Sequence, residues 1–229
     1  MGKQASFVTG AVLAVLAATA SSVRADPVVV ELFTSQGCSS CPPANANLAA
    51  IAGRPDVLAL SFGVTYWDQL GWKDTFAQDK FTARQYAYAR SLGHDGPFTP
   101  QVVVDGIKDG TGITRAEFDR LLTQAAPLAG PSLSLRPGNI QIGAAAAFRG
   151  EADVWLVRYD PRTISVPITA GENGGVTLPH RNVVKALTHL GLWRGDALQL
   201  VLPPTPQGLL TAILIQRTNG GPILAATKG

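Results

Sequence analysis

Apolar and polar positions follow two different periods in the first half of the chain. Residues 28–34 form an apolar, β-branched run and residues 57–62 a second, mainly apolar run, as is typical of buried strands. Between them, apolar residues recur three or four positions apart, as on one face of a helix, at Cys41, Ala44, Leu48 and Ala52. A strand, a helix and a second strand in this order predict a parallel βαβ unit.

The pattern continues with two more helices and a hairpin. Apolar residues at helical spacing predict a helix over 81–92. The strand-like run 101–104 is followed by Asp105-Gly106, a pair that favours a tight hairpin turn. Thr114 and Glu117 form a capping box, which predicts that another helix begins there.

From residue 131 the sequence changes to short apolar or alternating runs separated by glycine and proline. Strands of this length and spacing are typical of an antiparallel sandwich. Residues 182–192 fit either a strand or a helix, and we favour a strand. The pattern therefore predicts an α/β domain over 26–130, in which helices flank a mixed sheet. A smaller, mostly β, antiparallel sandwich-like module is expected over 131–229.

The first 25 residues have the pattern of an export signal. Lys3 supplies a positive charge, residues 7–20 form an apolar run, and a small residue, Ala25, precedes the expected cleavage point. This run is short for a membrane span, so we favour a cleaved signal peptide over 1–25 rather than an uncleaved anchor. After cleavage we expect no membrane span and a periplasmic or secreted protein.

The charge balance indicates no strongly charged partner. The sequence has 19 basic and 16 acidic side chains, and loss of Lys3 and Arg24 with the signal leaves 17 and 16. The chain has no basic stripe of the kind that nucleic acid requires. We therefore expect no nucleic-acid partner, and we assign no oligomeric state.

The chemistry centres on Cys38 and Cys41, the only two cysteines in 229 residues. Pro42 and Pro43 fit the first turn of the helix that follows them. Cys41 begins the apolar helix face and is expected to be covered, whereas Cys38 precedes it and is expected to be open. The unpaired N–H groups and positive dipole end of the helix favour a thiolate at Cys38. Such a pair attacks a disulfide through Cys38 and resolves the mixed disulfide through Cys41.

Two other interpretations of the cysteine pair remain open. The pair could form a structural disulfide, although closing so short a loop gains little chain entropy. It could also be half of a metal site, although a closed zinc site needs four ligands and the sequence has no second cysteine pair. Thiolates suit Cu(I), which would then need ligands from a partner protein. We favour the redox interpretation, and an exported protein can keep a disulfide in its resting state.

An irregular segment over 63–80 is rich in aromatic and charged residues. Trp67 could border the dithiol and receive substrate, although large aromatic side chains more often cover a core. The segment also supplies candidates for proton transfer at Cys41 or for stabilising a thiolate, namely Asp68, Asp74 and Lys73. Their spacing does not select among them.

Two polar positions lie outside this region. His94, in a turn, could be a metal ligand, but a lone histidine in a loop is more often a surface residue. Residues 178–182 could bind a ligand or contact the dithiol domain, but turn residues that cap strands explain them adequately.

The order of elements resembles the thioredoxin fold. Cys-Ser-Ser-Cys opens the first helix and Thr99-Pro100 leads the hairpin, as in that fold. The resemblance implies a cis Thr99–Pro100 bond beside the dithiol, with the Thr99 backbone pairing with bound peptide. Gly37 replaces the tryptophan that usually precedes the motif, and Ser39-Ser40 replaces Gly-Pro. Because this dipeptide influences redox poise, the direction of electron flow stays open.

Several segments are similar to a bacterial secreted family catalogued as domain of unknown function 1223. The longest is residues 31–43, Glu-Leu-Phe-Thr-Ser-Gln-Gly-Cys-Ser-Ser-Cys-Pro-Pro. Shorter matching segments are 66–68, 70–74, 99–106 and 181–184. The similarity covers nearly the whole mature chain, and it identifies a family rather than an activity.

We therefore expect a thioredoxin-like thiol–disulfide oxidoreductase that acts on protein thiols or disulfides with an unidentified redox partner. Cys38 and Cys41 are the expected catalytic residues, and Thr99, Pro100 and Trp67 are expected to contact substrate. No metal and no cofactor beyond the cysteine disulfide is expected. The alternative is a non-enzymatic binding or assembly module in which the pair is a structural disulfide or a soft-metal site.

Overall fold

The computed structural model describes residues 1–2 and 26–229, so the expected signal peptide over 1–25 lies almost wholly outside the described residues. Three α-helices and one short 3-10 helix are present in this part: α1 (Pro42–Ile51), α2 (Asp79–Leu92), α3 (Arg115–Thr123) and η1 (Asp68–Leu70). Its strands are β1 (Val28–Thr34), β2 (Val57–Gly63), β3 (Gln101–Val104), β4 (Lys108–Gly110), β5 (Leu133–Arg136), β6 (Asn139–Ile142), β7 (Ala152–Asp160), β8 (Ile164–Pro167), β9 (Thr177–His180), β10 (Val183–Trp193), β11 (Leu198–Val201), β12 (Leu210–Arg217) and β13 (Ile223–Lys228).

Eight strands form one mixed sheet in the order β13-β12-β7-β10-β2-β1-β3-β4. β1 and β2 run parallel and α1 connects them, so the predicted βαβ unit is confirmed. β3 lies antiparallel to β1, and β4 returns from it through Asp105 and Gly106, which both have positive φ. Aspartate and glycine tolerate this backbone region better than most residues, which places the hairpin here.

The expected sandwich-like module over 131–229 is present only in part. β7, β10, β12 and β13 extend the large sheet, while β5, β6 and β11 form a small antiparallel sheet and β8 and β9 form a hairpin. The physical reason lies at β2, which is buried along its whole length, so its outer edge needs a pairing strand. β10 supplies one through a parallel contact at Val183 and Ser61. The division of the chain at residue 130 stays a prediction.

Asn182 fixes the junction between the two halves of the sheet. Its Nδ2 donates to the Ala59 carbonyl at 2.8 Å, and its own carbonyl accepts from the Ser61 N–H at 3.0 Å. Its φ is 52°, a conformation that asparagine adopts more readily than most residues. Asn182, in the polar segment 178–182, therefore has a structural role, because it holds the start of β10 against β2.

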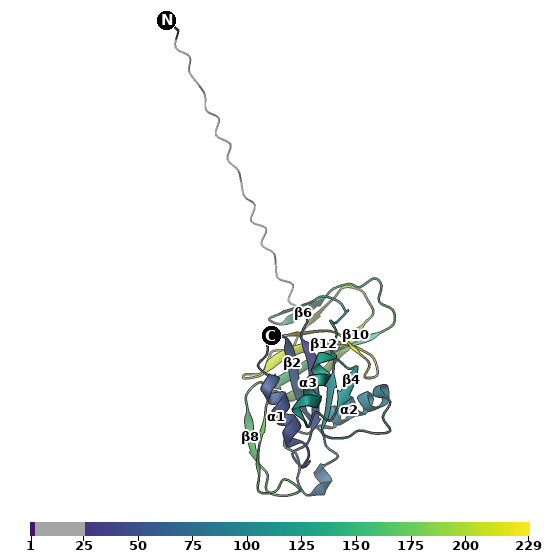
Figure 1. Cartoon of the computed structure of the whole chain (residues 1–229). Coiled ribbons are helices and arrows are strands. Elements are labelled where there is room, and N and C mark those ends of the chain that lie inside the picture. The colour runs from purple at the N-terminus through teal and green to yellow at the C-terminus, as the bar shows by residue number, and fades with distance from the viewer. Residues whose placement is uncertain (3–25) are drawn as a thin grey trace.

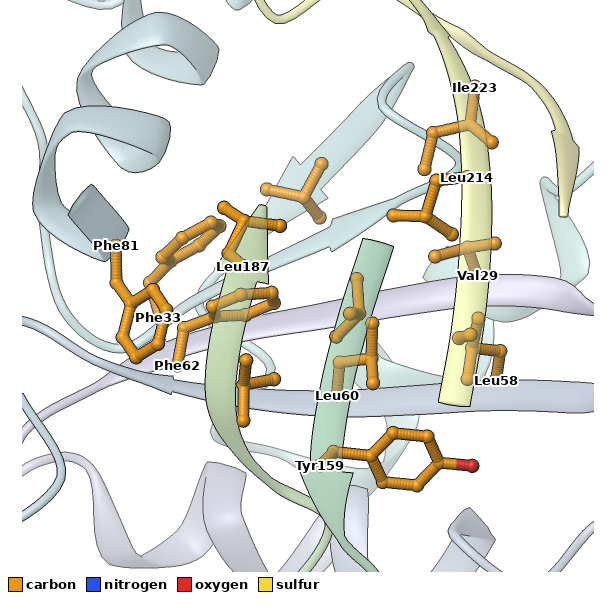
Figure 2. Close-up of a cluster of buried hydrophobic side chains, with 14 of the residues drawn as sticks. Val29, Phe33, Leu58, Leu60, Phe62, Phe81, Tyr159, Leu187, Leu214 and Ile223 are labelled. Carbon is orange, nitrogen blue, oxygen red and sulfur yellow. The ribbon is translucent and has the colours of Figure 1, made fainter. Parts of the chain in front are cut away.

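Both faces of the large sheet are covered (Figure 1). On one face, apolar residues from both halves of the sheet pack with α2, and Figure 2 shows Phe33, Phe62 and Phe81 gathered in this cluster. The rings of Phe33 and Phe62 stack with centroids 5.3 Å apart. On the other face, α1 and α3 cover β1 to β3, and the small sheet covers β7 and β12. The Cys38–Cys41 disulfide directly precedes α1, one of the helices that cover this second face.

A buried ion pair joins β1 to α2. Arg84 donates from Nε and Nη2 to the two carboxylate oxygens of Glu31, at 2.7 and 3.0 Å. Tyr88 also donates to Glu31, and Gln216 of β12 donates to the Tyr88 hydroxyl at 3.0 Å. The Glu31 side chain is fully buried. Its bidentate partner and the added hydrogen bond offset the cost of burying the charge.

Arg84→Met should destabilise the protein by about 3–5 kcal/mol, because it leaves the Glu31 carboxylate buried without a counter-charge. Urea unfolding followed by circular dichroism measures the change. The matched control is Arg115→Met, which breaks a 2.8 Å pair with Asp119 whose two side chains are 55% and 48% exposed. Its expected cost is about 0.3–0.5 kcal/mol. Equal losses in the two variants would show that burial of the pair is unimportant.

Candidate functional site

Cys38 and Cys41 form a disulfide in the turn between β1 and α1. Their Cα atoms are 5.5 Å apart, and no described cysteine is free. The Cys41 N–H donates to the Cys38 carbonyl at 3.2 Å and closes the turn. α1 begins directly after Cys41, with Pro42 and Pro43 in its first turn, as the sequence predicts.

Both cysteines are 0% exposed, so the expectation that Cys38 is open is wrong. The loop over 168–176, which connects β8 and β9, lies against this turn, and we refer to it as the covering loop. Asn173 of this loop is 7% exposed, and its Nδ2 donates to the carbonyls of Gln36 at 2.9 Å and of Cys38 at 3.0 Å. The local sequence cannot reveal this cover, because Asn173 lies 135 positions from Cys38. Within residues 38–41, only Ser39 and Ser40 are exposed.

The same loop places a negative charge beside the motif. Glu172 Oε2 accepts from the Ser39 N–H at 3.1 Å. Hydrogen bonds from the Ser39 side chain and from its backbone hold the pKa of the Glu172 carboxyl below its usual range, so it is ionised at neutral pH. This charge lies at the residue after Cys38, ahead of α1, whose positive dipole end would otherwise favour a Cys38 thiolate. A nearby anion disfavours the thiolate, so Glu172 opposes the low thiol pKa that the sequence predicts.

A second contact acts in the opposite direction. Ser40 Oγ lies 3.3 Å from Cys38 Sγ, within hydrogen-bond range for sulfur. In the reduced protein this hydroxyl can donate to the thiolate, which lowers the pKa of the thiol. Because Pro42 and Pro43 have no N–H, α1 offers fewer backbone donors than an ordinary helix start. The Ser40 hydroxyl can supply a donor to the thiolate that Pro42 and Pro43 cannot.

The structure brings the expected substrate-contact residues toward the disulfide. The Thr99–Pro100 bond is cis, as the thioredoxin resemblance implies. Trp67 Nε1 donates to Thr99 Oγ1 at 2.7 Å. A Cβ built on Gly37, the residue before Cys38, would lie 3.5 Å from the Trp67 Cβ. Trp67 therefore lies between the turn that holds the disulfide and the peptide that holds Pro100. Contact of these residues with a substrate stays a prediction.

Residues of the aromatic segment, among them Asp74, Trp72 and Thr75, hold Gln36 by hydrogen bonds. Asp74 is 4% exposed and accepts from the Gln36 N–H at 2.7 Å, and burial raises the pKa of its carboxyl. Trp72 Nε1 donates to Gln36 Oε1 at 2.9 Å. Among the hydrogen bonds of the described residues, none joins a cysteine to the three charged candidates Asp68, Asp74 and Lys73.

His94 has a polar partner, whereas the buried His180 has an aromatic neighbour. His94 Nε2 lies 2.7 Å from Asp109 Oδ2 at the surface. His180 is 2% exposed and packs edge-on against Phe76, and burial lowers its pKa to about 4. In the part of the chain that the structure describes, no group of three or more His, Cys, Asp or Glu is placed to hold a metal. The described helices also include none that is long and apolar enough to cross a membrane.

Three residues at the site were missed by the sequence analysis: Gln36, Glu172 and Asn173. The glycines around Asn173 do indicate a turn, since Gly171, Gly174 and Gly175 surround it. What the turn covers depends on the fold of the whole chain. No local sequence pattern predicts that this turn contacts the disulfide.

The fold and the site define a class of α/β protein in which a CxxC disulfide lies before a helix, beneath a loop from the second half of the chain. The chain belongs to the family described as protein of unknown function (DUF1223), whose model matches residues 29–216.

Two solved structures are similar to the chain. The crystal structure of a structural-genomics target protein from Agrobacterium tumefaciens is 32% identical, with a TM-score of 0.72, and the match covers 89% of this chain and 94% of that one. HBP35 of Porphyromonas gingivalis is 13% identical, with a TM-score of 0.55, over 90% of this chain and 75% of that one, which shows a similar fold alone. No curated protein matches the chain.

Asn173→Ala should speed reduction of the disulfide by tris(2-carboxyethyl)phosphine about tenfold, because two buried hydrogen bonds that hold the covering loop are lost. Alkylation at timed points followed by mass spectrometry gives the rate.

The matched control for this variant is Asn47→Ala. Asn47 also donates from Nδ2 to two carbonyls, those of Gly112 at 2.9 Å and Ile113 at 3.2 Å, but it does not hold the covering loop. Its reduction rate should stay at the wild-type value. If Asn173→Ala also leaves the rate unchanged, the loop is not the barrier to reduction.

Proposed function

We propose that the chain is a thioredoxin-like thiol–disulfide oxidoreductase that acts through Cys38 and Cys41. The observation that carries this proposal is the place of the disulfide, which precedes the helix of a βαβ unit and is linked through Trp67 to the cis Thr99–Pro100 peptide. The strand order β2-β1-β3-β4 supports a thioredoxin-like arrangement of residues 26–130. The placement of α1 and α3 on one face and α2 on the other supports it as well.

In the reducing direction, the dithiol transfers two electrons to a substrate disulfide. The Cys38 thiolate attacks one substrate sulfur, and the other substrate sulfur leaves as a thiolate that takes up a proton. The Cys41 thiol loses its proton and attacks Cys38 Sγ, which restores the Cys38–Cys41 disulfide and releases the first substrate sulfur as a thiol. Two electrons and two protons pass to the substrate, and the reverse steps oxidise a substrate dithiol.

Exchange requires the covering loop to move. An attacking thiolate needs free space at a cysteine sulfur, and both cysteines are fully buried in the closed arrangement. Opening removes the Asn173 amide from the carbonyls of Gln36 and Cys38. A peptide can replace it with its own backbone N–H groups, which favours a protein substrate over a small disulfide.

We further propose that the protein works outside the cytoplasm, in the periplasm or after secretion. The N-terminal export pattern supports this location, because disulfides persist in oxidising compartments. Its partners are then protein thiols or disulfides and a separate redox protein. The dithiol itself serves as the redox group, without metal or added cofactor.

A binding or assembly module with a structural disulfide is the second candidate. The complete burial of both cysteines favours it, since structural disulfides are normally shielded from thiols. The two candidates differ in a measurable way, because only the first needs a dithiol that reacts when the loop opens.

Two substitutions beside Cys38 should move its thiol pKa in opposite directions. Glu172→Gln removes a negative charge and should lower the pKa, whereas Ser40→Ala removes a donor to the thiolate and should raise it. Each shift should lie between a few tenths of a unit and about one unit. The ultraviolet absorbance of the thiolate in a Cys41→Ser background measures it. Glu151→Gln, whose partner Arg194 lies 2.7 Å away, is the control and should leave the pKa unchanged. Shifts of the same sign would refute this electrostatic account.

Trapping of a mixed disulfide tests the function itself. Reduced Cys41→Ser protein, mixed with an unfolded protein that carries disulfides, should accumulate a covalent complex through Cys38, because no resolving thiol remains. Cys38→Ser protein should accumulate far less, and mass spectrometry distinguishes the two. Absence of a complex from Cys41→Ser protein, even when Asn173→Ala opens the loop, would favour the structural disulfide.

A further inference from the structure

We propose that the protein binds a small organic carboxylate with an apolar tail in a cavity beside Arg158, a site that does not depend on the redox proposal. The cavity has a volume of about 420 Å³ and lies between the β5–β6 turn, the loop over 202–205 and β12. Leucine side chains form much of its walls, among them Leu135, Leu202 and Leu209. The polar side chains in the walls are Arg136, Arg158, Thr205 and Thr211. Pockets for small organic ligands have this size and this mixture of apolar walls and few convergent polar groups.

Arg158 is a buried charge without an acidic partner. It is 4% exposed, and none of the ion pairs between described residues includes it. No acidic residue lines the cavity. Buried arginines are normally paired with an anion, because burying an unpaired charge costs free energy. Arg84, which is also buried, follows this rule through Glu31.

The neighbours of Arg158 hold its guanidinium in place without neutralising it. Nη1 donates to Thr205 Oγ1 at 2.6 Å and to Thr211 Oγ1, and Nη2 donates to the Pro203 carbonyl at 2.5 Å. A guanidinium has five N–H groups, so the Nε–H and one Nη2 hydrogen remain for another acceptor. Within the described chain, Nε has no hydrogen-bond partner, and it is not among the fully buried unpartnered atoms.

Elsewhere in this protein, arginine binds a carboxylate through its Nε–Nη2 edge. Arg84 uses Nε and Nη2 to hold the two oxygens of Glu31 at 2.7 and 3.0 Å. A ligand carboxylate fits the same edge of Arg158 in a bidentate geometry, which is specific for a planar anion. The charge of the ligand would then neutralise the buried guanidinium.

The leucine walls select for an apolar tail. Leu202 is buried, and Leu210, at the border of the cavity, is 38% exposed, so a hydrocarbon chain that covers it removes apolar surface from water. Gly229, the last residue of the sequence, also borders the cavity with its terminal carboxylate. One oxygen of Gly229 accepts from the Thr211 N–H at 3.2 Å and its N–H donates to the Thr211 carbonyl at 3.0 Å, and none of the ion pairs between described residues joins it to Arg158. These bonds engage its backbone with β12.

Isothermal titration calorimetry of the wild-type protein with octanoate tests the site. Octanoate should bind saturably, while octylamine and inorganic phosphate should bind at least about tenfold more weakly, because they lack the carboxylate or the tail. Arg158→Gln should weaken octanoate affinity about ten- to hundredfold. Arg162→Gln, whose exposed guanidinium pairs with Asp160 at 2.7 Å, should leave it unchanged.

A second variant distinguishes loss of the ligand site from a folding defect. It is needed because Arg158 also holds the loop over 202–205. Leu209→Trp enlarges a half-buried wall residue, keeps the guanidinium, and should abolish octanoate binding. Circular dichroism and the unfolding midpoint establish that each variant is folded. Failure of wild-type protein to bind octanoate, equal binding of octylamine or phosphate, or full affinity in a folded variant would each overturn the proposal.

Discussion

The backbone of residues 36–38 is held by side chains from distant segments, and the disulfide turn depends on these bonds. Asp74 accepts from the Gln36 N–H, and Asn173 donates to the carbonyls of Gln36 and Cys38. All three bonds are buried. Loss of either bond at Gln36 leaves a backbone group unsatisfied at a cost of about 1–3 kcal/mol, whereas the Cys38 carbonyl still accepts from the Cys41 N–H. The chain can therefore keep an irregular turn between a buried strand and a helix.

The covering loop combines a steric and an electrostatic effect on the same pair of sulfurs. Asn173 ties the loop to the backbone of the disulfide turn, and Glu172 places a negative charge at the N–H of Ser39, the residue after Cys38. Both effects favour the oxidised, closed state, whereas the Ser40 hydroxyl favours the thiolate. A closed resting state with a reactive open state would keep the disulfide from reacting with thiols that do not displace the loop. Because the loop belongs to the second half of the chain, that half takes part directly in the site.

The sequence predicts local elements well because their signals are local. The apolar runs 28–34 and 57–62 predict β1 and β2. The Thr114 hydroxyl accepts from the Glu117 N–H at 3.2 Å, which is one half of the predicted capping box, whereas the Glu117 carboxylate accepts from the Thr111 N–H at 2.9 Å. Asp105-Gly106 likewise marks the β3–β4 hairpin. The burial of Cys38 is not predictable in this way, because its cover comes from Asn173, far along the chain. Strand order is equally hidden, since an apolar run shows that a strand is buried but not which strand pairs with it.

The reduction potential of the Cys38–Cys41 pair tests most directly whether the covered disulfide is capable of exchange. The protein would be equilibrated in glutathione buffers of graded ratio, alkylated and weighed by mass spectrometry. We expect a potential between about −120 and −270 mV, the range of thiol–disulfide exchange proteins. A potential below roughly −300 mV is typical of structural disulfides and would contradict the proposed oxidoreductase function.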